Sequence, residues 1–368
     1  MKILLAPDKF KGSLTAKEVC DALTVGIHDT NKAVEIIAKP LADGGDGSLE
    51  VLSHYLDLQT MECAVHDPLF RPIFATYKMT AETAYIEMAA ASGLVLLKEE
   101  ERNPLFTTSI GTGELMKDAF QKGATSIYLF IGGSATNDGG IGIAHALGYR
   151  FFDEHDQLLS PIGRSLNLIH RIDRSKVVFD STKINVQVIC DVNNPLYGEQ
   201  GAAHIYAPQK GATQEAVQYL DFGLRNLAQQ LIHHQLPPIA MVAGAGAAGG
   251  VGGGAIAFLG ASLVSGIDTF LKITNLESSL SISDIVITGE GKLDQQSLQG
   301  KVISGVCNLA KQYNKPVLAI CGTIEIEDLR PLGIQKGFSI LERSDTKEEA
   351  MKYAKEKLIE IGAILLLG

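Results

Sequence analysis

The chain has 368 residues, a length typical of about two domains. Hydrophobic residues make up 46% and charged residues 20%, which is the composition of an ordinary globular protein. The formal net charge of -10 disfavours nucleic acid and anionic lipid as partners. Five dispersed cysteines without a C-x-x-C pair argue against a disulfide framework and a zinc site. The apolar stretch after Lys2 is interrupted by Lys9 after only six residues, which is too short for a signal peptide. We therefore expect a protein of the reducing cytoplasm, with neither nucleic acid nor membrane among its partners.

The first sixty residues alternate between strand and helix patterns. Residues 2–6 form a short apolar run before Pro7, which predicts a strand buried on both faces. Residues 15–27 have apolar side chains at helical spacing, and Thr15 and Glu18 have the spacing of a capping box at its start. A second strand is predicted at 33–38 and a second helix at 48–56. This alternation predicts a parallel sheet with helices on its faces.

The rest of the chain adds further strands to this pattern. Short alternating segments at 75–79 and 83–88 are typical of antiparallel strands. Apolar strands are predicted at 126–131, 184–190, 284–288 and 316–321, so two α/β units are expected, with the N- and C-terminal parts sharing one sheet. Residues 261–271 predict a helix. The charge-free segment 235–267 is long enough to span a bilayer, but its many glycines and alanines favour a buried region.

Several predicted strands run into loops built from Gly, Ser, Thr, Asn and Asp. Open parallel sheets bind ligands at the carboxyl ends of their strands, so these loops predict a site for an anion and a cation. "PDKFKGSLTAKE" carries Lys9, Lys11 and Ser13, which suit a carboxylate or phosphate; the alternative is a solvated loop with a plain helix cap. "PLADGGDGS" offers Asp43 and Asp46, which can form a turn, ligate a cation or move a proton.

Two loops from the middle of the chain carry the next candidates. "IGGSATNDGGIG", residues 131–142, has more glycines and hydroxyls than a structural turn needs, and its successive N–H groups favour an anion-binding nest. "CDVNNPLYG" places Asp191 at a strand end, where its carboxylate can accept a hydroxyl proton, with Asn193 and Asn194 to orient a substrate. A simple Asx turn before Pro195 is the alternative for this second loop.

The C-terminal third contains one more polar loop and one ambiguous motif. "TGEGKLDQQSLQGK" combines Glu290, Lys292 and Asp294, which suit metal and phosphate binding, unless their charges simply pair in solvent. "GAGAAGG", residues 244–250, contains the G-x-G-x-x-G spacing of a dinucleotide-binding fingerprint, for which Asp268 would be the ribose ligand. A proline-headed segment before it and a helical pattern around Asp268 weaken that interpretation. Walker A, H-E-x-x-H and G-x-S-x-G motifs are absent from the sequence.

Taken in order, "APDKFKGSLTA", "PLADGGDGS", "IGGSATNDGG", "CDVNNPL", "APQKGA", "GAGAAGG" and "TGEGKLDQQ" resemble the motifs of the bacterial type I glycerate kinases, the glycerate 2-kinase family. The resemblance spans essentially the whole chain. It implies ATP-dependent phosphorylation of D-glycerate, with ATP as co-substrate and Mg²⁺. It also implies two α/β domains with an active-site cleft between them. We place a discontinuous Rossmann-like domain with a parallel sheet at 1–62 plus 281–368, and a larger inserted α/β domain with mixed strands at 63–280.

With this resemblance, roles can be assigned to the loop residues. Asp191 is expected to accept the glycerate hydroxyl proton, with Lys11 and Asp294 as further catalytic residues. Substrate binding is assigned to Asp8, Ser13, Asn193 and Lys292, and metal binding to Asp43, Asp46 and Glu290. Phosphate or nucleotide binding is assigned to Gly132, Gly133, Ser134, Thr136, Asn137 and Asp138.

The resemblance favours 2-phosphoglycerate as the product, with 3-phosphoglycerate as the other outcome. A nicotinamide-dependent oxidoreductase acting on a small hydroxy acid is the alternative function, since "GAGAAGG" would suit it. A non-catalytic small-molecule sensor is less favoured, because the sequence shows no basic DNA-reading helix. D-Glycerate is the expected small-molecule partner, and the chain is expected to be a monomer or a homodimer.

Overall fold

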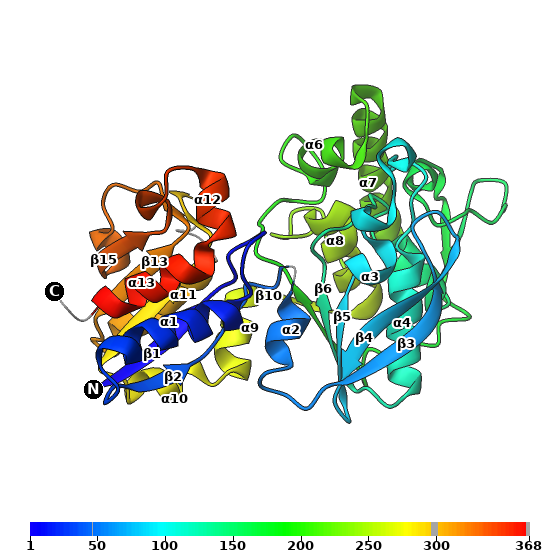
Figure 1. The fold of residues 1–368 in the computed structure, drawn as a ribbon. Coiled ribbons are helices and arrows are strands. Elements are labelled where there is room, and N and C mark those ends of the chain that lie inside the picture. The colour runs from blue at the N-terminus through cyan, green and yellow to red at the C-terminus, as the bar shows by residue number, and fades with distance from the viewer. Residues whose placement is uncertain (46, 296–300, 366–368) are drawn as a thin grey trace. The chain divides into compact units, whose positions relative to one another are not determined.

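The structure is a computed structural model that describes residues 1–45, 47–295 and 301–365. The chain divides into two compact units, which are coloured by residue number in Figure 1. The terminal unit contains Met1–Leu56 and the chain from Ser265 onward, and the central unit contains Asp57–Val264. The first unit is therefore assembled from both ends of the sequence.

A five-stranded parallel sheet forms the middle of the terminal unit. Its strand order is β15 (Ile334–Ser339), β13 (Val317–Cys321), β11 (Ile285–Gly289), β1 (Lys2–Pro7) and β2 (Glu35–Ala38). Strand β1 pairs with β2 on one side and with β11 on the other, so N- and C-terminal segments share one sheet as predicted. A short parallel ribbon joins β12 (Lys292–Leu293) to β14 (Thr323–Ile324).

Alternate residues of β1 face two separate hydrophobic cores, which confirms that this strand is buried on both sides. Ile3 and Leu5 pack with the apolar faces of α1 (Ala16–Thr30) and α13 (Ala354–Ile364). Leu4 and Ala6 pack with α9 (Gly266–Ile273), α10 (Leu276–Ser281) and α11 (Val302–Gln312). The remaining helices of this unit are α2 (Ser48–Leu52) and α12 (Lys347–Lys352). Because the pleat turns successive side chains to opposite faces, one strand serves both cores.

A six-stranded mixed sheet forms the middle of the central unit. Its order is β10 (Ser262–Val264), β9 (Asn185–Ile189), β6 (Ser126–Phe130), β5 (Thr83–Glu87), β4 (Pro72–Met79) and β3 (Gln59–His66). Strands β10, β9, β6 and β5 are parallel, whereas β5, β4 and β3 are antiparallel, as the sequence predicted for the segments near residues 75–88. A separate antiparallel pair joins β7 (Arg150–Phe152) to β8 (Arg171–Asp173).

Six α-helices within the described residues of the central unit pack on this sheet or on one another. They are α3 (Ala89–Ser92), α4 (Ile110–Gln121), α5 (Ile141–Ala146), α6 (Ala202–Tyr206), α7 (Gln214–His233) and α8 (Ala247–Leu259). Short 3₁₀ helices connect elements of both units: η1 (Leu94–Leu96), η2 (Glu99–Glu101), η3 (Gly163–Leu168), η4 (Pro208–Lys210), η6 (Arg330–Leu332) and η7 (Leu341–Arg343). The buried core of this unit joins the sheet to α4, α7 and α8.

Local sequence signals account for many of the element boundaries. The predicted capping box is confirmed, since Thr15 Oγ1 accepts a hydrogen bond from the Glu18 N–H at 3.2 Å and Thr15 N donates to Glu18 Oε2 at 2.8 Å. The helix predicted at 48–56 is shorter than expected, because α2 ends at Leu52 and turns follow.

The single helix predicted at 261–271 is wrong in its first part. Ser262–Val264 forms β10 beside β9, and α9 begins only after Ser265, whose side chain caps it through the Asp268 N–H at 3.3 Å. Apolar residues of the short strand continue the helical spacing, so the sequence pattern does not separate the two elements. Within the described residues, no helix is long and apolar enough to cross a membrane, the charge-free 235–267 segment included.

The two units divide at other positions than the predicted domain boundaries of 62/63 and 280/281. The structure divides after Leu56 and after Val264. Ile267 of α9 and Leu276 and Leu280 of α10 are buried in the core of the terminal unit, together with Leu4 of β1. These two helices therefore belong to the terminal unit, although the sequence assignment placed them with the inserted one.

Candidate active site

Three carboxylates of the terminal unit lie close together beside the carboxyl ends of adjacent strands. Asp8 follows β1 and Glu290 follows β11, and the Asp8 N–H donates to the Gly289 carbonyl at 2.8 Å. Burial raises the pKa of Asp8 to about 7, and the negative charges of Asp43 and Glu290 act in the same direction. We call Asp8, Asp43 and Glu290 the carboxylate cluster. Its charges disfavour one another, which is the situation that a bound cation relieves.

The carboxylate cluster offers the oxygen donors that Mg²⁺ prefers. Even so, no group of three or more His, Cys, Asp and Glu side chains within residues 1–45, 47–295 and 301–365 has the geometry of a metal site. The oxygen donors of the cluster suit a magnesium ion, but the positions of these side chains do not form a complete set of ligands. Asp46, the third predicted metal ligand, lies outside the described residues.

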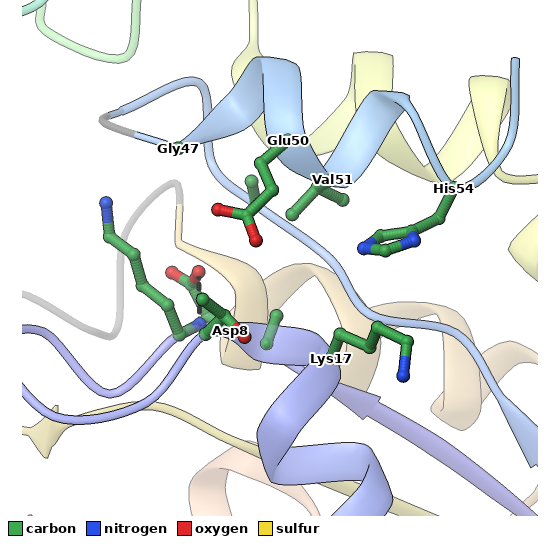
Figure 2. Close-up of a pocket in the computed structure, with 10 residues that line it drawn as sticks. Asp8, Lys17, Gly47, Glu50, Val51 and His54 are labelled. Carbon is green, nitrogen blue, oxygen red and sulfur yellow. Dashed lines mark hydrogen bonds between the residues drawn. The ribbon is translucent and has the colours of Figure 1, made fainter. Parts of the chain in front are cut away.

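A pocket opens beside the carboxylate cluster, within the terminal unit, and Figure 2 shows its lining. Asp8 and Lys9 come from the loop after β1, Thr15 and Lys17 from the start of α1, and Glu50 and His54 from α2 and the turn that follows it. In the close-up, the Glu50 side chain extends from α2 toward Asp8, whereas His54 and Lys17 lie at the other end of the pocket. The pocket thus joins both acidic and basic side chains at the carboxyl edge of the sheet.

Other predicted residues of the terminal unit make contacts of their own. Ser13 Oγ donates to the Met351 carbonyl at 2.8 Å, which ties its loop to α12. Lys292 pairs with Asp294 at 3.3 Å and with Glu325 at 2.9 Å, as the charge-pairing alternative for this loop proposed. Lys11 is exposed. The substrate roles of Ser13 and Lys292, and the catalytic roles of Lys11 and Asp294, stay predictions.

In the central unit, the predicted anion-binding loop connects β6 to α5. Its tip, Gly132–Gly133, is exposed, while residues 134–140, its stem, are buried. The Leu94 N–H donates to the Gly133 carbonyl at 2.8 Å, and the Ala135 N–H donates to the Ser92 carbonyl at 2.9 Å. The backbone of the loop is therefore anchored on both sides of Ser134 by the segment after β5.

The stem of this loop contains several fully buried polar side chains. Asp138 accepts hydrogen bonds from Ser109 N and Ser109 Oγ, both at 2.7 Å, and from the N–H groups of Gly140 at 3.0 Å and Gly142 at 3.3 Å. Burial raises the pKa of the Asp138 carboxyl above its usual value, and these hydrogen bonds offset only part of that effect. The carboxylate thus faces the interior, where it organises the loop, rather than the exposed tip where its predicted phosphate role would place it.

The "GAGAAGG" segment packs backbone against backbone on the same stem. A Cβ on Gly249 would lie 2.1 Å from the Thr136 carbonyl oxygen, and a Cβ on Gly254 would lie 2.2 Å from the Gly139 carbonyl oxygen. Residues 236–246, all described, contain no strand, and Asp268 lies in the first turn of α9. A dinucleotide fingerprint needs a strand, a turn and a helix in sequence. These glycines instead serve close packing, which removes the physical basis of the oxidoreductase alternative.

Asp191 and Asn193 lie on the exposed loop that follows β9. Because β6 and β9 are parallel neighbours, this loop and the anion-binding loop leave the same edge of the sheet. Asn194 has a structural role, since its side chain donates to the Gln200 carbonyl at 2.8 Å and accepts from the Tyr206 hydroxyl at 2.6 Å. The structure therefore brings the predicted base and the predicted phosphate loop to one edge.

Comparison with known proteins identifies the family. A protein-family sequence model, described as "Glycerate kinase family", matches residues 3–366 of this chain. The chain belongs to the glycerate kinase family. A relative named glycerate 2-kinase, from Escherichia coli K12, is 41% identical over 376 residues that cover 100% of this chain and 99% of the relative. A glycerate kinase of Halalkalibacterium halodurans is 41% identical over 98% of this chain and 96% of its own length.

A crystal structure from Salmonella typhimurium LT2, described as a candidate glycerate kinase 2, has the same fold. It superposes with a TM-score of 0.88 at 39% identity and covers 99% of this chain and 97% of its own. Membership of the glycerate kinase family confirms the predicted resemblance and makes the chain an enzyme of the kinase class.

One glycerate kinase motif, "APQKGA", supplies a residue that the site prediction missed. Lys210, at the end of η4, is only 3% exposed. Its Nζ donates to Ser134 Oγ at 2.9 Å and to the Thr136 carbonyl at 2.7 Å. Burial lowers the pKa of Lys210 to about 7, against the opposing effect of the Asp138 charge. The motif was the available signal, since nothing in the local pattern marks this lysine as buried.

Proposed function

We propose that this protein catalyses the ATP-dependent phosphorylation of D-glycerate to 2-phosphoglycerate. The observation that carries the proposal is the similarity, over the whole chain, to the E. coli relative named glycerate 2-kinase. Phosphoryl transfer depends on positioning and charge stabilisation, so a glycine-rich backbone loop, lysines and carboxylates are the parts that it needs. Both units of this chain present such groups at the carboxyl edges of parallel strands.

The anion-binding loop is proposed to hold the phosphates of ATP at its exposed tip. A Cβ on Gly132 would meet no atom within 4 Å, and the backbone of Gly132 has no positive φ. Packing therefore does not require glycine at this position. A ligand that approaches the backbone closely would require it, as phosphate does in glycine-rich loops. Ser134 and the Asn137 side chain lie in the stem beneath this tip.

The remaining groups are proposed to act on glycerate and on the metal ion. Asp191 accepts the proton of the attacking hydroxyl, and Asn193 orients the substrate. Lys11 holds the glycerate carboxylate or the γ-phosphate. Asp43 and Glu290 of the carboxylate cluster hold Mg²⁺, which neutralises phosphate charge when bound.

Phosphorus NMR of the product tests both activity and regiochemistry. We expect D-glycerate, Mg²⁺ and ATP to give ADP and one new phosphate ester signal, split into a doublet by the single proton on C2. A triplet, from the two protons on C3, would mean 3-phosphoglycerate. The control omits glycerate. If no ester forms with D-glycerate, Mg²⁺ and ATP all present, the proposed reaction is wrong.

The Gly132→Ala variant tests the phosphate role of the loop tip. Since the added methyl group meets no protein atom, we expect an unchanged midpoint of thermal unfolding. The methyl group occupies the space reserved for the ligand, so we expect the KM for ATP to rise about tenfold or more. Steady-state kinetics with ATP and with glycerate as the varied substrate measure this. Unchanged values for both substrates would show that no ligand approaches Gly132.

A further inference from the structure

The anion-binding loop of the central unit is held from two sides. The segment after β5 fixes its backbone through the Gly133 carbonyl and the Ala135 N–H. From the other side, Lys210 reaches Ser134 Oγ and the Thr136 carbonyl with its ammonium group. Lys210 thus contacts the stem directly below the exposed glycines, although the assigned roles do not include it.

A buried ammonium is unfavourable unless something compensates for the lost hydration. Here the compensation is incomplete. Lys210 has two neutral oxygen partners, and the charge that opposes the effect of burial on its pKa is that of Asp138. The carboxylate of Asp138 is already occupied by Ser109 and by the N–H groups of Gly140 and Gly142. The positive charge of Lys210 is therefore only partly neutralised by the protein.

We propose that Lys210 is a positioning residue of the anion-binding loop, whose buried ammonium fixes the stem and supplies the positive charge that favours a phosphate at the tip. The proposal rests on the proposed phosphate role of this loop. An incoming anion completes the neutralisation that Asp138 leaves unfinished, so the bound anion stabilises the protonated lysine. Binding then takes up a proton wherever the lysine of the free enzyme is partly neutral.

The sign of the pH dependence follows from the burial of Lys210. Because burial lowers the pKa of Lys210 to about 7, its charged fraction falls as the pH rises through that value. The groups facing it are Asp138, from the loop, and the non-ionisable Ser134 and Thr136. Arg102 packs against the adjacent Gly211 through its backbone oxygen and Cβ. We therefore expect the affinity for an anion at the tip to decline above about pH 7.

Lys210→Met removes the charge and both hydrogen bonds, and Lys210→Gln keeps a donor without the charge. The backbone anchors of the loop remain in both variants, and removing a buried charge relieves a desolvation penalty, so both are expected to fold. The exposed Lys183, which pairs with Asp180 at 3.3 Å, provides the matched control Lys183→Met. Urea unfolding of all three variants checks that the fold is retained.

Calorimetric titration with ADP is the test. Near pH 6.5, we expect Lys210→Met and Lys210→Gln to bind ADP about tenfold more weakly than the unmutated protein, because both variants lack the positive charge beneath the tip. This difference in ADP affinity between the Lys210 variants and the unmutated protein, called the gap below, is expected to be smaller at about pH 8.5, where the lysine of the free protein is largely neutral. ADP and Asp8 also titrate in this range, but both are present in every variant, so the gap isolates Lys210. Lys183→Met should match the unmutated protein throughout.

A gap that is the same at both pH values would overturn the electrostatic role, and the absence of any gap would overturn the proposal altogether. Failure of the proposed function has a different signature. An unmutated protein that binds ADP with the pH-dependent gap but forms no phosphoglycerate would keep the role of Lys210 and reject the glycerate kinase activity. An unmutated protein that binds no ADP would reject both.

Discussion

Asp191→Asn is expected to lower the kcat for glycerate phosphorylation about 10²- to 10⁴-fold, because loss of a general base normally has an effect of that size. The amide matches the carboxylate in shape but cannot take up the hydroxyl proton. Asp191 is exposed on the loop after β9, so the substitution leaves the core untouched. The KM values are expected to change little, since the proton is transferred mainly in the transition state.

Single-turnover kinetics with saturating D-glycerate and Mg-ATP measure this effect. The matched control is Asp156→Asn, which makes the same change at an exposed aspartate that pairs with Arg171 at 2.8 Å. This control should retain full activity. If Asp191→Asn stays within about threefold of the unmutated protein, Asp191 is not the base.

Gly249→Ala is expected to destabilise the protein by about 2–5 kcal/mol and to abolish most activity. Gly249 has a φ of +71°, which an alanine adopts only with strain, and the new Cβ would lie 2.1 Å from the Thr136 carbonyl. That carbonyl is also an acceptor for Lys210. The stem of the anion-binding loop must therefore move, and the displacement reaches the groups proposed to bind phosphate.

Two further substitutions separate backbone strain from steric conflict. Gly123→Ala places alanine at a φ of +101° with no atom within 4 Å of its Cβ, so it reports the backbone strain alone. Ala248→Gly relieves a positive φ of 53° beside Gly249 and should be neutral or slightly stabilising. Chemical denaturation of the three variants gives the comparison. Equal losses for Gly249→Ala and Gly123→Ala would contradict the close packing described here.

Much of the fold could be predicted because the local signals are strong. The apolar run of β1 predicted burial on both faces, and Thr15 and Glu18 predicted the start of α1. The boundary between units was harder to predict. The apolar faces of α9 and α10 look the same in sequence whichever unit buries them, and only the contact of Leu276 and Leu280 with the core around β1 assigns them.

The candidate site shows the same limit at the level of side chains. Loop composition predicted which segments lie at the carboxyl edges of strands, but not the direction in which each side chain points. Asp138 turns inward to Ser109, and Ser13 contacts Met351. Lys210 was given no role from the sequence, yet it is buried against the anion-binding loop. Such orientations depend on contacts between distant segments, which no local pattern encodes.

The sharing of one sheet by both chain ends has a consequence for biosynthesis. Lys2, at the start of β1, and Asp284, just before β11, are hydrogen-bonded to each other and are 282 residues apart. At bacterial and eukaryotic elongation rates, the ribosome takes about 15–55 s to bridge that interval. Until then, β1 has only β2 as a partner, and a two-stranded pair is marginally stable at best. We therefore expect the nascent N-terminal segment to stay without a stable sheet during synthesis, accessible to chaperones and proteases, while the continuous central unit can fold ahead of it.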